Sequence, residues 1–284
     1  MRSGVRERAS IQWILPSVSK TVSGVKASAE GSNPSPYALS PTDGGTAPAR
    51  DAYSLPAMRL TLYEHPFALY CQKVVIALYE RGIAFDRVVV GEDVSREQLA
   101  EVWPMASIPV LRDDEAEVIV PETTIIIEYL DRIAADGPLM IPADADEALE
   151  ARGWDRFFDQ YVSTPVQTIV FDVLKPAERR DPETVADARR TLDIAYDVLE
   201  GHFAERELAA GSGFTVADCA AAPALFYAWV PNPWDERTHP NLTRYYRDLA
   251  HRPSYAKVID EARPYRDVYP LPWPEDPDRY HVKA

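Results

Sequence analysis

The chain has 284 residues, 46% of them hydrophobic, which suits two modest domains with a sizeable core. Its 45 acidic side chains exceed its 30 basic ones and give a formal net charge of −15, so nucleic acid is disfavoured as a partner because phosphates would be repelled. No apolar run reaches the roughly 18 residues of a membrane-spanning helix, and Cys71 and Cys219 have no neighbour at metal-site or redox-pair spacing, so we expect a soluble, cytoplasmic protein without a metal.

Residues 1–57 differ in composition from everything that follows. They are rich in Ser, Pro, Gly and Ala and lack the apolar surface for a core, so we expect a disordered extension. An Arg- and Ser-rich, acid-poor beginning is compatible with an organelle transit peptide. The alternative, which the sequence favours, is an upstream extension without a structural role, because Met58 directly precedes the first predicted strand as an initiator would.

The next stretch predicts alternating strands and helices. Residues 59–63 alternate polar and apolar like a short strand, and apolar residues recur with helical spacing from Cys71 onward. A second strand-like run covers residues 85–90. Pro109 then interrupts a third one, where it cannot donate to a sheet. Helical spacing over residues 122–133 closes this α/β region.

Beyond a linker of Gly, Pro and Asp, the pattern is helical throughout. Pro165 should bend the first long helix, and Thr215 and Asp218 have the spacing of a capping box. The predicted helices cover residues 148–174, 182–203, 215–229, 240–251 and 253–262. The sequence thus predicts an α/β domain (58–136), an all-helical domain (146–265) and an extended tail (266–284), rich in Pro, Tyr and Trp, that packs over the surface and could cover a site.

Four short motifs resemble the cytosolic glutathione S-transferase family. Residues 68–74, Ala-Leu-Tyr-Cys-Gln-Lys-Val, stand where the family commonly has Ser-Pro-Tyr/Phe-x-x-Lys/Arg-Val, and residues 108–111 match its Val-Pro-Val/Ile-Leu. Glu122-Thr123 matches its helix-opening Glu-Ser, and residues 214–218 match a motif of its helical domain. The resemblance spans about residues 58–264. It implies a thioredoxin-like domain with a cis proline, an all-helical second domain and a homodimer.

The resemblance also implies a glutathione site. If Glu122 and Thr123 open a helix, free N–H groups and the Thr123 hydroxyl can hold the γ-glutamyl carboxylate, while the Glu122 side chain pairs with the ammonium. The backbone of Ile108, before Pro109, can pair with the cysteinyl unit in the manner of an added strand. The candidate glutathione-binding residues are Ala68, Leu69, Ser107, Ile108, Pro109, Glu122 and Thr123.

Activation of the thiol is where the chain departs from the family pattern. Ala68 lacks the hydroxyl with which serine-containing members donate to the thiolate. The candidate donors are Tyr63, Tyr70 and the N–H groups of Leu69 and Tyr70, although each tyrosine also suits a half-buried packing position. Cys71 could form a mixed disulfide with glutathione if its pKa were low, but it also begins the apolar face of the helix, where a packed thiol is expected.

An apolar pocket for a second substrate is expected at the domain interface. Trp154, Phe158 and Tyr161 are the candidates for it, although their helical spacing also suits the core of the bundle. The sequence therefore predicts a glutathione transferase that acts in detoxification and joins the glutathione thiolate to a small hydrophobic electrophile. A non-catalytic glutathione- or ligand-binding protein of the same fold, or a thiol-exchange enzyme using Cys71, remain alternatives.

Overall fold

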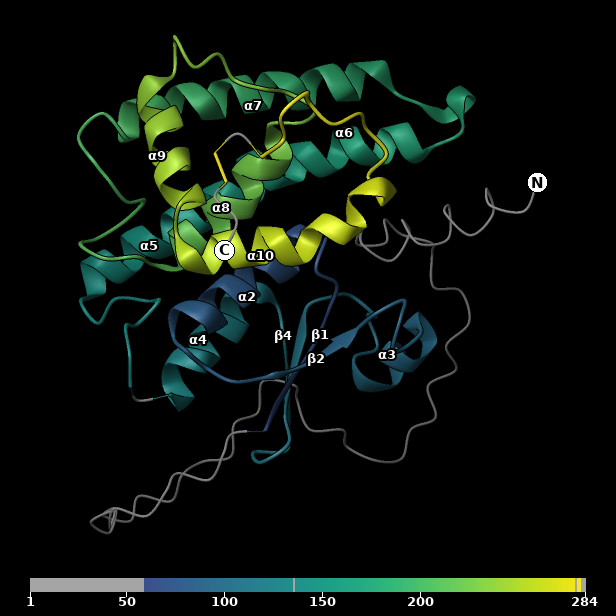
Figure 1. Cartoon of the computed structure of the whole chain (residues 1–284), viewed down its shortest axis with the longest axis vertical. Helices are drawn as coiled ribbons and strands as arrows, with labels where there is room; N and C mark the ends of the chain where they lie inside the picture. The colour runs from purple at the N-terminus through teal and green to yellow at the C-terminus, as the bar shows by residue number, and fades with distance from the viewer. Residues whose placement is uncertain (1–58, 135, 279, 282–284) are drawn as a thin grey trace.

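The computed structural model describes residues 59–134, 136–278 and 280–281. The segment predicted to be disordered, residues 1–57, lies outside them. A small sheet with its helices forms one end of the molecule, and a bundle of helices forms the other (Figure 1). The predicted combination of a thioredoxin-like α/β domain and an all-helical domain is confirmed. Within the described residues, no helix is both long and apolar enough to cross a membrane.

The sheet has the strand order β2-β1-β3-β4. Strand β1 is parallel to β2 and antiparallel to β3, which pairs antiparallel with β4. Because side chains alternate along a strand, Leu60 and Leu62 face the core with α2 and α4, whereas Tyr63 packs in a smaller cluster with Leu99 of α3. The bounds are β1 Leu60–Glu64, α2 Leu69–Glu80, β2 Asp86–Val89, α3 Arg96–Val102, β3 Val110–Asp113, β4 Val118–Pro121 and α4 Thr123–Ile133.

The helical domain has one irregularity that matters for the site. The predicted long helix is divided by a π-helical segment, Phe158–Ser163, in which the N–H of Thr164 bonds to the carbonyl of Asp159. Pro165 lies in the first turn of the helix that follows, and because it has no N–H it cannot bond to a carbonyl of the π segment before it. The bounds are α5 Ala145–Phe157, α6 Thr164–Leu174, α7 Pro182–His202, α8 Val216–Ala228, α9 Pro240–Ala250 and α10 Pro253–Ala262, with 3₁₀ turns at Ala177–Arg179 and Arg263–Val268.

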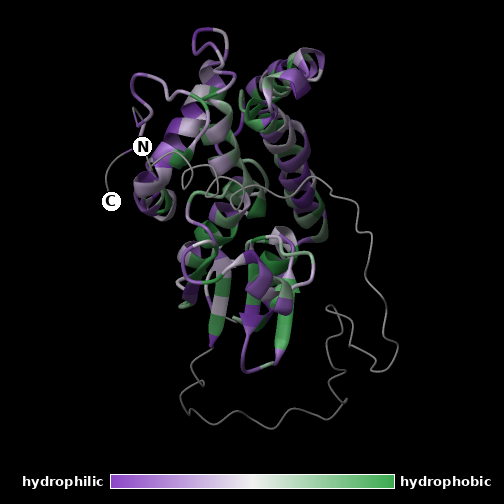
Figure 2. Cartoon of the chain, turned by 90° about the vertical axis from the view of Figure 1, so that its right-hand side faces the viewer, coloured by the Kyte–Doolittle hydropathy of each residue, from purple (hydrophilic) through white to green (hydrophobic). Residues whose placement is uncertain are grey.

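Helix α8 lies at the centre of the molecule. All its residues are buried, and it packs against both α2 and α5, so one hydrophobic core runs through both domains. Hydrophilic residues gather on the outer helices instead (Figure 2). The predicted capping box is present: Thr215 and Asp218 bond to each other's backbone N–H groups. Part of the predicted extended tail is helical, because residues 263–268 continue α10 as a 3₁₀ turn.

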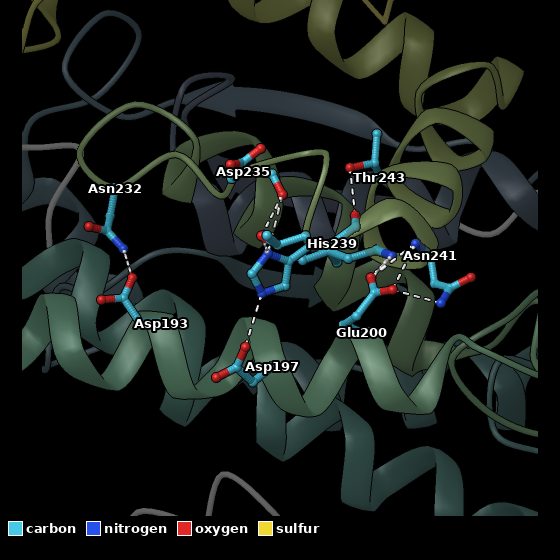
Figure 3. Close-up of polar contacts among 10 residues, drawn as sticks. Asp193, Asp197, Glu200, Asn232, Asp235, His239, Asn241 and Thr243 are labelled. Carbon is cyan, nitrogen blue, oxygen red and sulfur yellow. Dashed lines mark hydrogen bonds and ion pairs between the residues drawn. The ribbon is translucent and has the colours of Figure 1, made fainter.

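Acidic side chains of α7 hold the connection between α8 and α9 (Figure 3). Glu200 accepts hydrogen bonds from the backbone N–H groups of Asn241, at 2.9 Å, and Leu242, at 3.0 Å. His239, the residue before α9, makes no side-chain cap of its own. Glu200 therefore satisfies N–H groups that the start of α9 would otherwise leave unpaired.

Candidate functional site

A cavity lies where the two domains and the C-terminal segment meet. The α/β domain lines it with the loop before α2, the start of α2 and the loop before β3. Helices α6 and α8 add mostly apolar side chains, and residues 268–270 of the tail complete the wall. The cavity thus combines backbone suited to a peptide with an apolar surface suited to a second molecule.

Four of the seven candidate glutathione residues line this cavity: Ala68, Leu69, Ser107 and Ile108. Ala68 is the N-cap of α2 and has an extended backbone, so the first N–H groups of α2 begin at the cavity wall. The peptide bond between Ile108 and Pro109 is cis. The Ser107 hydroxyl accepts a 3.3 Å hydrogen bond from the Trp103 indole.

Glu122 and Thr123 are not among the residues that line the cavity, but they lie next to it in the sheet. Val110 pairs with Pro121, so the antiparallel register brings Glu122 beside Pro109. Glu122 has φ 71° and ψ 123°, a conformation that costs a non-glycine residue about 1 to 3 kcal/mol. The Glu122 side chain is exposed and forms no capping hydrogen bond to α4. The side chain and the first N–H groups of α4 therefore do not bond to each other at the helix start. Strain of this kind is concentrated at ligand-binding positions.

Behind this helix start lies a buried ionic cluster that the sequence did not reveal. Lys73 of α2 is fully buried and pairs with Asp155 of α5 and Asp159 of the π segment. The Thr124 hydroxyl donates a 2.7 Å hydrogen bond to Asp155 and lies 3.3 Å from the Lys73 ammonium. Burial raises the pKa of Asp159, and Lys73 counteracts this. The cluster fixes the start of α4 against both α2 and the helical domain.

The two candidate tyrosines differ in position. Tyr63 does not line the cavity, and its hydroxyl accepts a 2.7 Å hydrogen bond from Arg112 on the neighbouring strand β3. Tyr70 does line the cavity, and burial raises its pKa to about 12. Near neutral pH the Tyr70 phenol is therefore protonated and can act as a donor.

Cys71 of α2 is completely buried. Burial raises the pKa of its thiol well above the ordinary value, with the nearby Glu64 carboxyl adding to the effect. In this conformation Cys71 presents no thiolate to the cavity, because only an ionised, accessible sulfur reacts readily.

The structure places none of the candidate acceptor residues in the cavity. Phe158 is fully buried in the core, Trp154 stacks on His202 with ring centroids 3.8 Å apart, and Tyr161 is 49% exposed. The same stretch of chain lines the cavity further along, with Val166, Gln167 and Val170. The prediction assumes one uninterrupted helix over residues 148–174, with a single repeat of residues facing the other domain. The π segment interrupts that period, so residues before and after it do not share the expected face.

Sequence reasoning missed Tyr227 and left the role of the tail open. Tyr227 of α8 donates a 2.8 Å hydrogen bond to the carbonyl of Phe67, in the loop before α2. Val268, Tyr269 and Pro270 of the tail line the cavity. The high content of Pro, Tyr and Trp was the signal for a packed tail, but no local pattern indicated which residues reach the site.

Comparisons with known proteins agree with this architecture. Residues 62–138 match the family model "Glutathione S-transferase, N-terminal domain", and residues 182–248 match "Glutathione S-transferase, C-terminal domain". The chain is 28% identical over 205 residues to glutathione S-transferase GstB of Escherichia coli, covering 70% of this chain and 97% of that protein. It is also 28% identical over 167 residues to a stringent starvation protein A homolog of Pasteurella multocida, covering 59% and 74% of the two chains.

A solved structure shows the same similarity. It is a glutathione S-transferase of Methylobacterium radiotolerans in complex with glutathione sulfonate, 28% identical, with a TM-score of 0.63 over 71% of this chain and 94% of that chain. Both family models match in the expected order, and the fold agrees along the aligned length. The chain therefore belongs to the glutathione S-transferase family.

Proposed function

We propose that this protein is a glutathione transferase, which binds glutathione along the start of α2, the cis-proline loop and the start of α4 and joins its thiolate to a hydrophobic electrophile. The observation that carries the proposal is the cavity itself. Ala68, Leu69, Ser107 and Ile108 line the same space as the apolar side chains Val166, Val170 and Val268. A peptide thiol and an apolar acceptor can therefore lie side by side in this space.

The positions of the charged groups agree with this use. The γ-glutamyl carboxylate would bind the N–H groups at the start of α4, where the helix dipole favours an anion, and the Glu122 carboxylate would pair with the ammonium. Ala68 supplies no hydroxyl, so the thiolate would depend on the N–H groups of α2 and on a neighbouring phenol. A partly buried helix start stabilises an anion by up to about 2 kcal/mol, which lowers a thiol pKa by about 1.5 units.

Calorimetric titration with glutathione, followed by a panel of apolar electrophiles, tests the proposal. We expect 1:1 binding per chain and turnover of at least one class of electrophile. Ophthalmic acid, which has a methyl group in place of the thiol, should bind without turnover. No heat of binding at millimolar glutathione would refute the proposal.

One observation favours a second function, a non-catalytic glutathione- or ligand-binding protein. It is Ala68, which removes the usual hydroxyl donor at the thiol. Binding without an ionised thiol at pH 7, and without turnover, would select this alternative. A thiol-exchange enzyme would need Cys71 to be reactive, and titration of the folded protein with a thiol reagent should then modify it rapidly.

We further propose that the protein acts as a homodimer in the cytoplasm. Ile125 of α4 and Leu149 of α5 are exposed apolar residues, 42% and 71% accessible, on the helices that the predicted dimer would use. Arg152 and Glu128 form an ion pair between the same two helices. Sedimentation at micromolar concentration should give twice the chain mass, and Leu149→Glu should give monomers because it places a charge in the interface.

A further inference from the structure

The loop of residues 65–68 leads into the start of α2, which would face the sulfur of glutathione. A polar N-cap side chain usually helps to fix the geometry of a helix start. Ala68 is the N-cap residue of α2 and makes no side-chain cap, and the first turn of α2 has no acidic residue. The geometry of this helix start therefore depends on other contacts to the loop.

Three successive carbonyl groups of the loop accept hydrogen bonds. The His65 carbonyl accepts one from the Ala68 N–H, at 2.8 Å, within the loop itself. The Pro66 carbonyl accepts a 2.8 Å hydrogen bond from the side-chain amide of Gln72, in the first turn of α2. The Phe67 carbonyl accepts a 2.8 Å hydrogen bond from the phenol of Tyr227, which lies 160 positions further along the chain in α8. The loop is thus fixed to α2 on one side and to the helical domain on the other.

Gln72 and Tyr227 also bond to each other. The Gln72 amide nitrogen donates to the Tyr227 hydroxyl at 3.2 Å, and both side chains are buried. The Tyr227 ring packs edge-on against the ring of Phe67, with centroids 5.4 Å apart. Burial raises the pKa of the Tyr227 phenol well above its ordinary value, so the phenol stays protonated and continues to donate to the loop around neutral pH.

The other end of the Gln72 amide indicates what the side chain contributes. Its Oε1 atom is buried and has no hydrogen-bond partner among the described residues, and an unpaired buried acceptor costs about 1 to 3 kcal/mol. A methionine of similar length would fill the same space without that cost. What the amide adds in return is the pair of hydrogen bonds from its nitrogen, which orient the loop.

We infer that Tyr227 and Gln72 are positioning residues for the thiolate, because they hold the loop in the geometry that points the first N–H groups of α2 at the sulfur. The inference deepens the proposed function and rests on it, since Ala68 leaves the thiolate dependent on these N–H groups. Both residues act through the loop. Gln72 does not line the cavity, and the Tyr227 hydroxyl is already bonded to the Phe67 carbonyl.

The test measures the ionisation of bound glutathione in the wild type, Tyr227→Phe and Tyr255→Phe. Tyr255 of α10 is the matched control, because its buried hydroxyl also donates to a backbone carbonyl, that of Ala222 at 2.9 Å, but it does not line the cavity. The readout is the ultraviolet absorbance of the thiolate against pH, with the S-methylglutathione complex as the blank.

We expect Tyr227→Phe to raise the pKa of the bound thiol by about 0.5 to 1 unit, which is part of the about 1.5 units that a helix start can supply. Tyr255→Phe should leave that pKa unchanged although it also removes a buried hydrogen bond. S-methylglutathione has no thiol to ionise, so its affinity should stay within about twofold in all three proteins. Loss of stability alone would not produce this combination.

Gln72→Met is a second test that does not depend on the folding of Tyr227→Phe. It removes the hydrogen bond to the Pro66 carbonyl and should raise the pKa of the bound thiol in the same way. An unchanged thiol pKa in either variant overturns the inference, and so does an equal shift in Tyr255→Phe.

A wild type that binds glutathione without lowering its thiol pKa also overturns the inference, because there is then no stabilised thiolate to position. Failure of the wild type to bind either glutathione or S-methylglutathione would instead refute the proposed function itself. Calorimetry with the two peptides separates these failures.

Discussion

The ammonium of Lys73 lies 2.5 Å from Oδ1 of Asp155, and both side chains are fully excluded from solvent. The pair joins α2 of the α/β domain to α5 of the helical domain, and Asp159 lies 3.1 Å from the same ammonium. Thr124 extends the contact to the start of α4 through its hydrogen bond to Asp155. This buried cluster therefore joins the two domains behind the candidate glutathione site.

Replacing Lys73 by Met should lower the free energy of unfolding by about 3 to 5 kcal/mol, because it leaves buried carboxylates without a counter-charge. Arg152→Ala is the matched control: it breaks the exposed pair with Glu128, between α5 and α4, and should cost at most about 1 kcal/mol. Urea unfolding of the wild type and the two variants measures both losses of stability. Similar small losses in the two variants would show that the buried cluster adds little to stability.

Glu122→Ala should weaken glutathione binding by about 1.5 to 3 kcal/mol, the usual contribution of a hydrogen bond to a charged group. Glu122→Gly should bind as weakly as Glu122→Ala but unfold at a higher temperature, because glycine adopts φ 71° without a steric penalty. Calorimetry and melting curves separate the two effects. An unchanged dissociation constant in both variants, with an intact fold, would place the ammonium elsewhere.

Ala68→Ser should lower the pKa of bound glutathione by about one to two units, because the new hydroxyl can donate a charge-assisted hydrogen bond to the sulfur. The ultraviolet absorbance of the thiolate against pH measures this shift, and activity near neutral pH should rise with it. Tyr63→Phe is the comparison. Tyr63 is held by Arg112 outside the cavity, so we expect no change in thiol ionisation. A loss of ionisation in Tyr63→Phe would identify Tyr63 as the donor.

Glu200→Ala should destabilise the protein by about 1.5 to 3 kcal/mol, because it removes the only cap we find for the start of α9 in the described structure. Asp197→Ala, one turn earlier on α7, removes an exposed contact to His239 and should cost at most about 1 kcal/mol. Denaturant midpoints of the two variants give the comparison. Equal effects would mean that water replaces Glu200 at the helix start.

The pH dependence of stability should include a contribution from His65. Burial lowers the pKa of His65 from 6.5 to about 4, and its Nδ1 accepts a 3.1 Å hydrogen bond from the Phe67 N–H. As the pH falls, His65 therefore takes up a proton in the unfolded chain before it does so in the folded chain. The contribution of neutral His65 to stability is complete above pH 6.5 and is lost as the pH falls toward 4. His65→Asn keeps an acceptor and should reduce the slope of stability with pH in that window by up to about 1.4 kcal/mol per pH unit. Identical slopes in denaturant titrations at pH 7, 5.5 and 4.5 would contradict this.

The sequence by itself determined the features that depend on local physics. The capping box of Thr215 and Asp218 followed from spacing along one helix, and the alternation at residues 59–63 followed from a strand with two faces. The family resemblance added the order of the two domains and the cis bond before Pro109, both of which the structure contains. The residues that form these motifs are close together in the chain, so the motifs can be recognised without tertiary information.

Only the tertiary structure decided which side chains surround the cavity. The π segment changed the face that residues beyond it present, so Val166 and Val170 line the wall while Phe158 is buried in the core. Tyr269 lines the cavity because the tail folds back over it, where Arg263 and Arg266 pair with Asp278 and Trp273 bonds to the Arg266 carbonyl. The period of a helix is set by hydrogen bonds between residues that are close in the chain. The side chains that line the cavity are instead brought together by packing between segments about 200 residues apart, and no local sequence pattern predicts such contacts.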